Sequence, residues 1–264
     1  PLPTPSLQES ISIKINGGLY IMGYPGDQFC YDIELPEHKV YLDDYKIDSC
    51  PITNKQYMKF IEDGGYDDFK YWLSDGWDKI QNEKWNAPMY WEKFDGQWMT
   101  CDFLGRRKIN PNEPVCHVSF YEADAYCKWA GKRLPTEAEW EKVSRDQTEG
   151  EYPFEGGAEF LPDYGWFRDN SGGLIHIAAE KTPNSYGVYD TLGNVWEWVF
   201  DHYVFYRLQN KDNPQGPKTG AYRVLRGGAW NDPAEYLRPA LRRDTLPQST
   251  RFNVGFRCAV DLPE

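Results

Sequence analysis

The stretch PVCHVSFYEADAYCKWAGKRLPTEAEWE, residues 114–141, holds two helix starts in 28 residues. Ser119 and Glu122 have the spacing of a capping box, in which the hydroxyl accepts from an orphan backbone N–H and the carboxylate accepts from the N–H of the capping residue. Thr136 and Glu139 repeat this pattern. The stretch therefore predicts a helix, a short turn and a second helix.

The turn between the two predicted helices is GKRLP, residues 131–135. Glycine is favoured just after the end of a helix and proline near the start of one, so this run separates the helices. Tyr121, Ala125, Trp129 and Trp140 are then available as buried anchors.

The composition of the 264-residue chain limits the kind of protein. Aromatic residues make up 16%, and because each buries a large area they can supply a sizeable core despite a mean hydropathy of -0.74. The 23 glycines and 19 prolines predict a loop-rich fold. The net charge of -12 argues against a nucleic-acid partner, which needs clustered Lys and Arg. No apolar run approaches the roughly 18 residues of a membrane helix, so no membrane insertion is expected.

Residues 11–23, which alternate polar and apolar with a Gly-Gly break, predict a strand, a turn and a strand, and residues 38–48 predict another strand pair. Later strands are predicted in residues 221–230 and 252–260. Between them, Thr53 is expected to cap a helix that stops at Gly64.

Two long stretches, residues 66–113 and 147–188, show little periodicity. We expect the first to be an ordered excursion held by aromatic residues and the second to be irregular. With no internal repeat, the sequence predicts one α+β domain over residues 11–264, preceded by an N-terminal arm or linker over residues 1–10.

A family resemblance rests on several motifs that occur in a set order. They are Gly17-Gly18 with Met22-Gly23, residues 117–141, GNVWEW (193–198), RVLRGGAW (223–230) and VGFRC (254–258). Together they resemble the formylglycine-generating enzyme (sulfatase-modifying factor) domain. This resemblance implies the loop-rich variant of the C-type lectin fold that such domains adopt.

A narrower resemblance lies in the excursion. WLSDGW (72–77), APMYW (87–91) and EPVCH (113–117) are similar to the C-terminal domain of ergothioneine sulfoxide synthases. Those enzymes couple a thiol to a histidine betaine on a mononuclear iron.

This chain lacks the metal-binding residues on which both of these chemistries depend. The copper-binding cysteines of formylglycine-generating enzymes follow the RGGxW strand, where this chain has NDPAEYL (231–237). The synthases take iron through a His-x3-His-x-Glu motif of a separate helical domain, and the four histidines here have no such spacing. Residues 242–251 also depart from the substrate-holding pattern of the synthases. We expect neither copper nor iron in this chain alone, which favours a protein without catalysis of its own.

The resemblance also implies a structural calcium site and a cysteine pair. The positions that match the calcium site are Asp190, Gly193, Val195 and Glu197, with carboxylate and carbonyl oxygens that suit Ca²⁺. A hydrogen-bonded turn is the alternative. Cys127 and Cys258 match a disulfide of secreted relatives, and we expect them to be bonded or neighbouring.

Neither His117 nor Cys116 is predicted to be catalytic. We expect His117 to be a buried structural histidine in a strand, and Cys116 to be a small core residue.

Ligand binding is predicted for the irregular segment between the last strands, residues 231–252. It is rich in residues that adaptable binding surfaces favour. They are Asn231, Asp232, Glu235, Tyr236, Arg243, Asp244, Thr245, Gln248, Ser249 and Phe252. Variable proteins of diversity-generating retroelements, which share this fold, diversify the same region, whereas an ordinary solvated loop is the structural alternative.

Two functions remain open. One is a non-catalytic module that binds a protein or small molecule through residues 231–252. The other is the C-terminal domain or subunit of an ergothioneine-type sulfoxide synthase, with a helical iron-binding domain as its partner.

Overall fold

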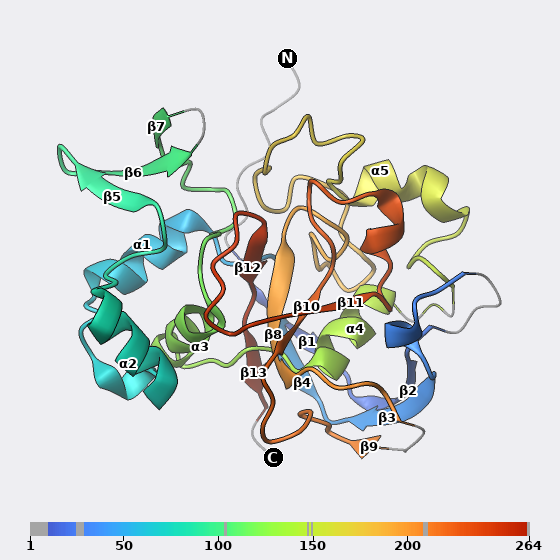
Figure 1. Cartoon of the computed structure of the whole chain (residues 1–264). Helices are drawn as coiled ribbons and strands as arrows, with labels where there is room; N and C mark the ends of the chain where they lie inside the picture. Colours follow the sequence, from blue (N-terminus) through green and yellow to red (C-terminus); the bar gives the residue numbers. More distant parts are fainter. Residues whose placement is uncertain are drawn as a thin grey trace.

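The computed structural model describes residues 10–24, 29–102, 105–146, 148, 150–207 and 211–262. A four-stranded sheet lies at its centre, in the order β11-β10-β8-β12 (Figure 1). These strands are β8 (Trp196–His202), β10 (Arg223–Arg226), β11 (Arg242–Thr245) and β12 (Val254–Phe256). Only the pairing of β12 with β8 is parallel in this sheet. The predicted N-terminal arm lies outside the described residues apart from Ser10.

Three smaller sheets surround the central one. The first contains β1 (Ser12–Ile15), β4 (Tyr45–Asp48) and β13 (Ala259–Asp261). The second contains β2 (Gly18–Met22), β3 (His38–Leu42) and β9 (Lys211–Asp212). The third contains β5 (Trp91–Phe94), β6 (Gln97–Asp102) and β7 (Gly105–Lys108).

The strands predicted in residues 11–23 and 38–48 are confirmed, but neither segment pairs with itself. Instead β1 pairs with β4, and β2 pairs with β3. Gly17 permits this change of sheet because a Cβ there would lie 2.2 Å from the Leu42 carbonyl oxygen.

The predicted helices are confirmed with their caps. They are α1 (Asn54–Glu62), α3 (Phe120–Trp129) and α4 (Glu137–Arg145). The capping boxes at Ser119 and Thr136 are both formed, with Glu122 and Glu139 accepting from the capping N–H groups at 2.7 Å. A further short helix is α5 (Leu161–Tyr164). Among the described residues, every helix is too short or too polar to cross a bilayer.

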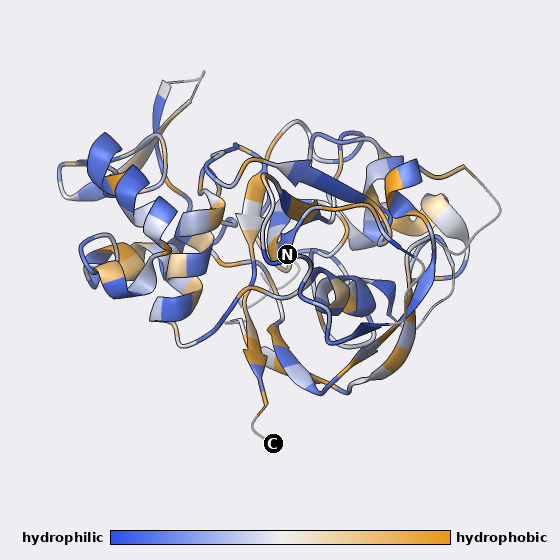
Figure 2. Cartoon of the chain, turned by 60° about the horizontal axis from the view of Figure 1, so that its bottom comes forward, coloured by the Kyte–Doolittle hydropathy of each residue, from blue (hydrophilic) through white to orange (hydrophobic). Residues whose placement is uncertain are grey.

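Aromatic residues dominate the core, as their abundance predicted. Tyr57 stacks on Tyr126 with ring centroids 5.5 Å apart, and Phe256 meets the Tyr126 ring edge-on at 5.3 Å. Of the expected anchors, Ala125 and Trp140 are buried, whereas Tyr121 and Trp129 are half-buried against the core. Figure 2 shows the hydrophobic stretches along the central strands and mostly polar stretches on the outer helices.

A buried ion pair joins the central sheet to its surroundings. Arg257 and Glu197 are both fully buried and make two hydrogen bonds of 2.6 and 2.7 Å. Glu197 also accepts from the Trp140 indole of α4, and Arg257 donates to the carbonyls of Asp48 and Tyr189. Because a buried charge is costly unless it is compensated, these contacts hold the elements in one arrangement.

The excursion predicted over residues 66–113 contains regular elements that the lack of periodicity did not indicate. They are α2 (Ser74–Glu83) and the β5–β7 sheet, which lie on one side of the central sheet in Figure 1. The start of α2 gives no signal because Leu73 at the N-cap position makes no side-chain hydrogen bond. The β7 strand is exposed throughout, so no polar–apolar alternation marks it.

Gly76 of α2 allows that helix to approach α3, and its replacement tests the packing. A Cβ at this position would lie 2.7 Å from the Tyr121 Cβ atom. Alanine normally stabilises a helix interior by roughly 0.5–1 kcal/mol over glycine. We expect Gly76→Ala instead to lower the free energy of unfolding by about 1–3 kcal/mol, the cost of overpacking. Urea denaturation measures this, with the exposed Asn82→Ala of the same helix as control. A Gly76→Ala variant that is more stable than the wild type would contradict the packing.

Candidate functional site

The predicted binding segment, residues 231–252, is more ordered than expected. It contains a short 3-10 helix, η4 (Ala234–Leu237), and the strand β11, which pairs with β10 from Thr245 opposite Arg223 to Arg242 opposite Arg226. The strand was missed because Arg242, an inward position, carries a charge rather than an apolar side chain. That charge is compensated by Glu137, which accepts two hydrogen bonds of 2.7 Å.

Two of the ten predicted ligand residues are buried, so their prediction as surface contacts is corrected. Asp232 accepts hydrogen bonds from the Trp196 indole at 2.7 Å and from the Ala229 N–H at 3.1 Å. Thr245 is 5% exposed and bonds to Ser249 and Arg251. Both residues therefore lie beneath the surface of the segment and hold it in place through hydrogen bonds.

The other eight predicted residues reach the surface. Those classed as exposed are Glu235, Arg243, Asp244, Gln248 and Phe252, and those half-buried are Asn231, Tyr236 and Ser249.

Three side chains of this segment, Tyr236, Arg243 and Phe252, form with the preceding Trp230 what we call the platform. The Trp230 and Phe252 rings lie 5.8 Å apart, and the Arg243 guanidinium lies 5.9 Å from the Tyr236 ring and 5.5 Å from the Trp196 ring. Within the described structure, the buried Trp230 indole nitrogen has no hydrogen-bond acceptor. Sequence reasoning missed Trp230 because it ends RVLRGGAW (223–230), a motif that is evidence for the family and not for ligand binding.

The residues predicted to bind calcium lie around one buried turn. Asp190 accepts from the Ala179 N–H at 2.7 Å, while its other oxygen is buried without a well-formed hydrogen bond in the described structure. Burial raises the pKa of Asp190 to about 6. Gly193 has a positive φ of 96° and lies so close to Trp166 that a Cβ would meet its carbonyl oxygen at 2.2 Å. Glu197 is occupied by Arg257 and Trp140, and Val195 is fully buried.

Cys127 and Cys258 lie side by side although 131 residues separate them in the sequence. Their sulfur atoms are 3.0 Å apart and both thiols are free and buried. Among the described residues, no group of three or more His, Cys, Asp and Glu side chains is placed to hold a metal ion.

His117 does not lie in a strand, contrary to the prediction. Its φ is +63°, and its ring is half-buried and meets the Tyr90 ring edge-on at 5.0 Å. The predicted core position of Cys116 is confirmed by its burial, which raises the pKa of this thiol.

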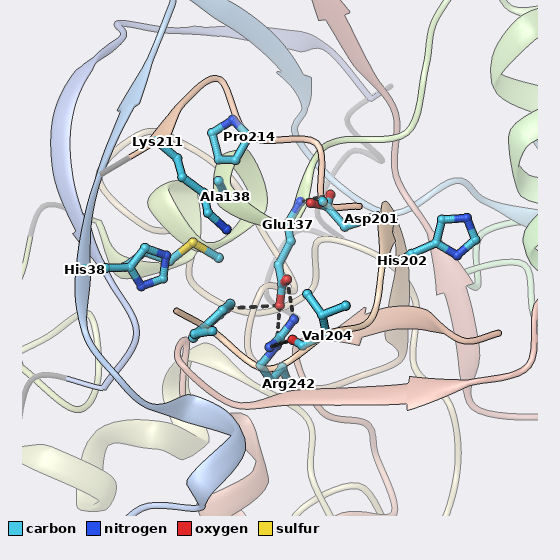
Figure 3. A pocket seen from close by; sticks show the side chains of 12 residues that line it. His38, Glu137, Ala138, Asp201, His202, Val204, Lys211, Pro214 and Arg242 are labelled. Atoms are coloured by element: carbon cyan, nitrogen blue, oxygen red, sulfur yellow. Dashed lines mark hydrogen bonds and ion pairs between the residues drawn. The ribbon is translucent and has the colours of Figure 1, made fainter. Parts of the chain in front are cut away.

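A small cavity of about 30 Å³ lies where α4 meets β8 and β11. Figure 3 shows Glu137 and Arg242 pointing toward each other, with Asp201 beside them and His38 on the opposite wall. Asp201 accepts from the Glu137 N–H at 2.7 Å. Burial, together with the Glu137 charge, raises the pKa of Asp201 to about 7. Sequence reasoning missed this cluster because its members are far apart in the sequence. Glu137 and Arg242 alone are separated by 105 residues.

The order of strands and the capped α3–α4 pair define a formylglycine-generating-type variant of the α+β fold in a single domain. The chain belongs to the family of sulfatase-modifying factor enzyme 1-like domains, whose model matches residues 2–262. It is 32% identical to the formylglycine-generating enzyme of Streptomyces coelicolor, over 94% of this chain and 88% of that protein.

Two further proteins are similar to this chain. The hercynine oxygenase of Mycolicibacterium smegmatis is 32% identical over 95% of this chain, which spans only 61% of that protein. The solved structure of Treponema denticola variable protein 1 superposes with a TM-score of 0.74, at 23% identity and with 95% of each chain covered. The second likeness concerns the fold alone.

The raised pKa of Asp201 predicts a pH-dependent stability. The folded protein binds this proton more tightly than the unfolded chain, whose aspartates have a pKa of about 3.9. The stability that Asp201 contributes is therefore complete below about pH 4 and is lost as the pH rises through about 7. An Asp201→Asn variant keeps an acceptor for the Glu137 N–H and has no charge to desolvate. Relative to the wild type, we expect it to gain about 1–3 kcal/mol of unfolding free energy between pH 4.5 and pH 8.

Chemical denaturation at a series of pH values measures this gain. The exposed Asp244→Asn is the control, for which the difference from the wild type should change little with pH. A difference between Asp201→Asn and the wild type that stays constant from pH 4.5 to pH 8 would contradict the raised pKa.

Proposed function

We propose that this chain is a ligand-binding domain whose contact surface is the platform and the exposed residues around it in 231–252. The observation that carries this proposal is an exposed arginine and an exposed phenylalanine ring held above buried, hydrogen-bonded residues. Arg243 and Phe252 are exposed, while Asp232 beneath them is held by two hydrogen bonds. A preordered surface loses little conformational entropy on binding.

The chemistry of the platform supports a protein or peptide ligand over an ordinary solvated loop. Tryptophan, tyrosine and arginine are the residues that most often carry binding energy at interfaces. Phe29 and Tyr31 extend the aromatic surface, since the Tyr31 ring lies 6.0 Å from that of Tyr236.

A second candidate function is the substrate-binding part of an iron-dependent enzyme of the hercynine oxygenase type. It is favoured by identities of 32–35% to three hercynine oxygenases, of which this chain spans only 55–61%. In this candidate the iron ligands come from a helical domain outside this chain. Two of the motifs similar to the synthases, at residues 72–77 and 87–91, overlap α2 and the start of β5, and these elements would then belong to the substrate side.

We also propose a structural calcium ion at Asp190, with the main-chain carbonyls of Gly193 and Val195. The buried oxygen of Asp190, which lacks a well-formed hydrogen bond in the described structure, supports a cation at this place. Glu197 supports it less, because three hydrogen bonds from Arg257 and Trp140 leave its carboxylate about one free lone pair.

Selection from a displayed random dodecapeptide library tests the platform. We expect peptides enriched on the wild type to bind roughly tenfold or more weakly to Phe252→Ser and Arg243→Gln, because these side chains are central and exposed. Leu19→Ser and Lys39→Gln on the exposed side of β2 and β3 are matched controls. Enriched peptides that bind all four variants equally would contradict the proposed surface.

Titration with hercynine separates the two candidate functions. Binding of hercynine, together with sulfoxide formation when Fe(II), cysteine, oxygen and the helical domain of the Mycolicibacterium smegmatis enzyme are added, would favour the oxygenase candidate. Platform-dependent peptide binding without hercynine binding would favour the ligand-binding domain.

Calcium binding is tested by thermal unfolding. Millimolar CaCl₂ is expected to raise the melting temperature of the wild type, since an ion that binds only the folded state stabilises it. In Asp190→Asn the increase should be lost, and Asp244→Asn, an exposed position, should retain it. An unchanged melting temperature of the wild type with calcium or with chelator would refute the site.

A further inference from the structure

A second cavity, distinct from the platform, opens between α2 and the central sheet. It has a volume of about 460 Å³, within the range of small-molecule sites. Its walls come from the start of α2, from α3, from the end of β8, from residues 218–221 with the start of β10, and from residues 247–248. We call this cavity the cleft. The residues used below are Asp75, Tyr121, His202, Lys218, Thr219 and Arg223.

Arg223 in the cleft differs from the fully buried arginines of this protein. Arg226, Arg238, Arg242 and Arg257 each have a glutamate within 3 Å. Within the described residues, no carboxylate lies within 4.0 Å of the Arg223 guanidinium. Its Nη1 donates to the Phe200 carbonyl, whereas its buried Nε has no acceptor there. The charges of Asp124 and Asp201 act on this guanidinium only from a longer distance. A half-buried guanidinium with an unpaired N–H is unfavourable, so Arg223 has room for a directly bound anion.

The surroundings of Arg223 orient it for such a partner. Its guanidinium lies 4.0 Å from the Phe120 ring, which restricts its movement. His202 is its direct neighbour across the β8–β10 pair, and the His202 Nδ1 atom is buried without a partner in the described structure. Burial and the Arg223 charge both lower the pKa of His202, so this ring is neutral at neutral pH and can accept or donate. Lys218 adds a positive charge at the rim.

The opposite wall of the cleft carries a negative charge. Asp75 is exposed in the first turn of α2 and lines the cleft. The charges of Asp75 and Arg223 act on the Tyr121 hydroxyl in opposite directions, which means that both lie near this side chain. The cleft therefore presents a cation and an anion within the reach of one small molecule, with an aromatic ring close to both.

We propose that the cleft binds a zwitterion of amino-acid size, with its carboxylate on Arg223 and its ammonium group toward Asp75. Guanidinium is well suited to the carboxylate because it offers a fork of N–H donors. The aromatic ring of Tyr121 provides apolar contact for the body of the molecule. This site shares none of the four platform residues, and Gln248 is its one lining residue from the predicted ligand set, so the proposal rests on Arg223, Asp75 and Tyr121 and not on the function proposed above.

Calorimetric titration with each of the twenty L-amino acids tests the site. We expect at least one to bind with a dissociation constant of about 1 mM or below, a modest affinity for so few charged contacts. For the tightest binder, the primary amide and the deamino acid should each bind about tenfold or more weakly, because each lacks one of the two charges. Inorganic phosphate should not compete. Competition by phosphate, or equal binding of all three analogues, would overturn the zwitterion assignment.

Variants locate the binding. Arg223→Gln removes the carboxylate partner, and Asp75→Asn removes the ammonium partner at an exposed position. Thr219→Trp fills the rim of the cleft, with Leu19→Trp as a matched exposed control and Lys39→Gln as a charge control. We expect the first three to weaken binding about tenfold or more and the two controls to leave it unchanged. Failure of all twenty amino acids to bind, or undiminished binding by Asp75→Asn and Thr219→Trp, would overturn the proposal.

Discussion

The fold depends on the buried ion pair between Arg257 and Glu197. Glu197 belongs to β8 at the centre of the main sheet, and Arg257 follows β12, its parallel neighbour. Through the Trp140 indole and the carbonyls of Asp48 and Tyr189, the pair also contacts α4, β4 and the turn before β8. Since neither charge has access to water, separating any of these elements would leave a buried charge uncompensated. The helices and the smaller sheets therefore keep fixed positions around the central sheet.

The need to compensate a buried charge also distinguishes structural arginines from surface arginines elsewhere in the protein. Arginines 226, 238 and 242 are buried and each is paired with a glutamate, so they belong to the frame. Arg243 is the next residue in β11 after Arg242 and points to the opposite face, where it lies over aromatic rings and is exposed. Arg223 is intermediate, half-buried and without a carboxylate within ion-pair distance in the described part of the chain. Among the described residues, Arg243 has only the distant Asp232 carboxylate, at 4.0 Å, and Arg223 has none within that distance, so both of these arginines keep donor capacity for a ligand.

Sequence patterns succeeded where their physical cause is local. The capping boxes at Ser119 and Thr136 depend on groups three residues apart, and both formed as predicted. The patterns failed where packing at long range replaced the local signal. The start of α2 has Leu73 in place of a capping side chain, and Gly76 is accommodated only because Tyr121 of α3 packs against it. Within the predicted binding segment, Asp232 was expected at the surface because it is charged, yet the Trp196 indole holds it inside.

By itself the sequence determined the family, the single α+β domain, the capped helical pair and an aromatic core. These properties follow from the order of motifs, from hydrogen bonds between near neighbours and from the composition. Only the tertiary structure decided which side chains meet in the cleft and on the platform. Asp75, Tyr121 and Arg223 come from α2, α3 and β10, and nothing in their local sequence relates them. The reason is that their proximity results from burying apolar surface and compensating charges across the whole chain, which no short stretch encodes.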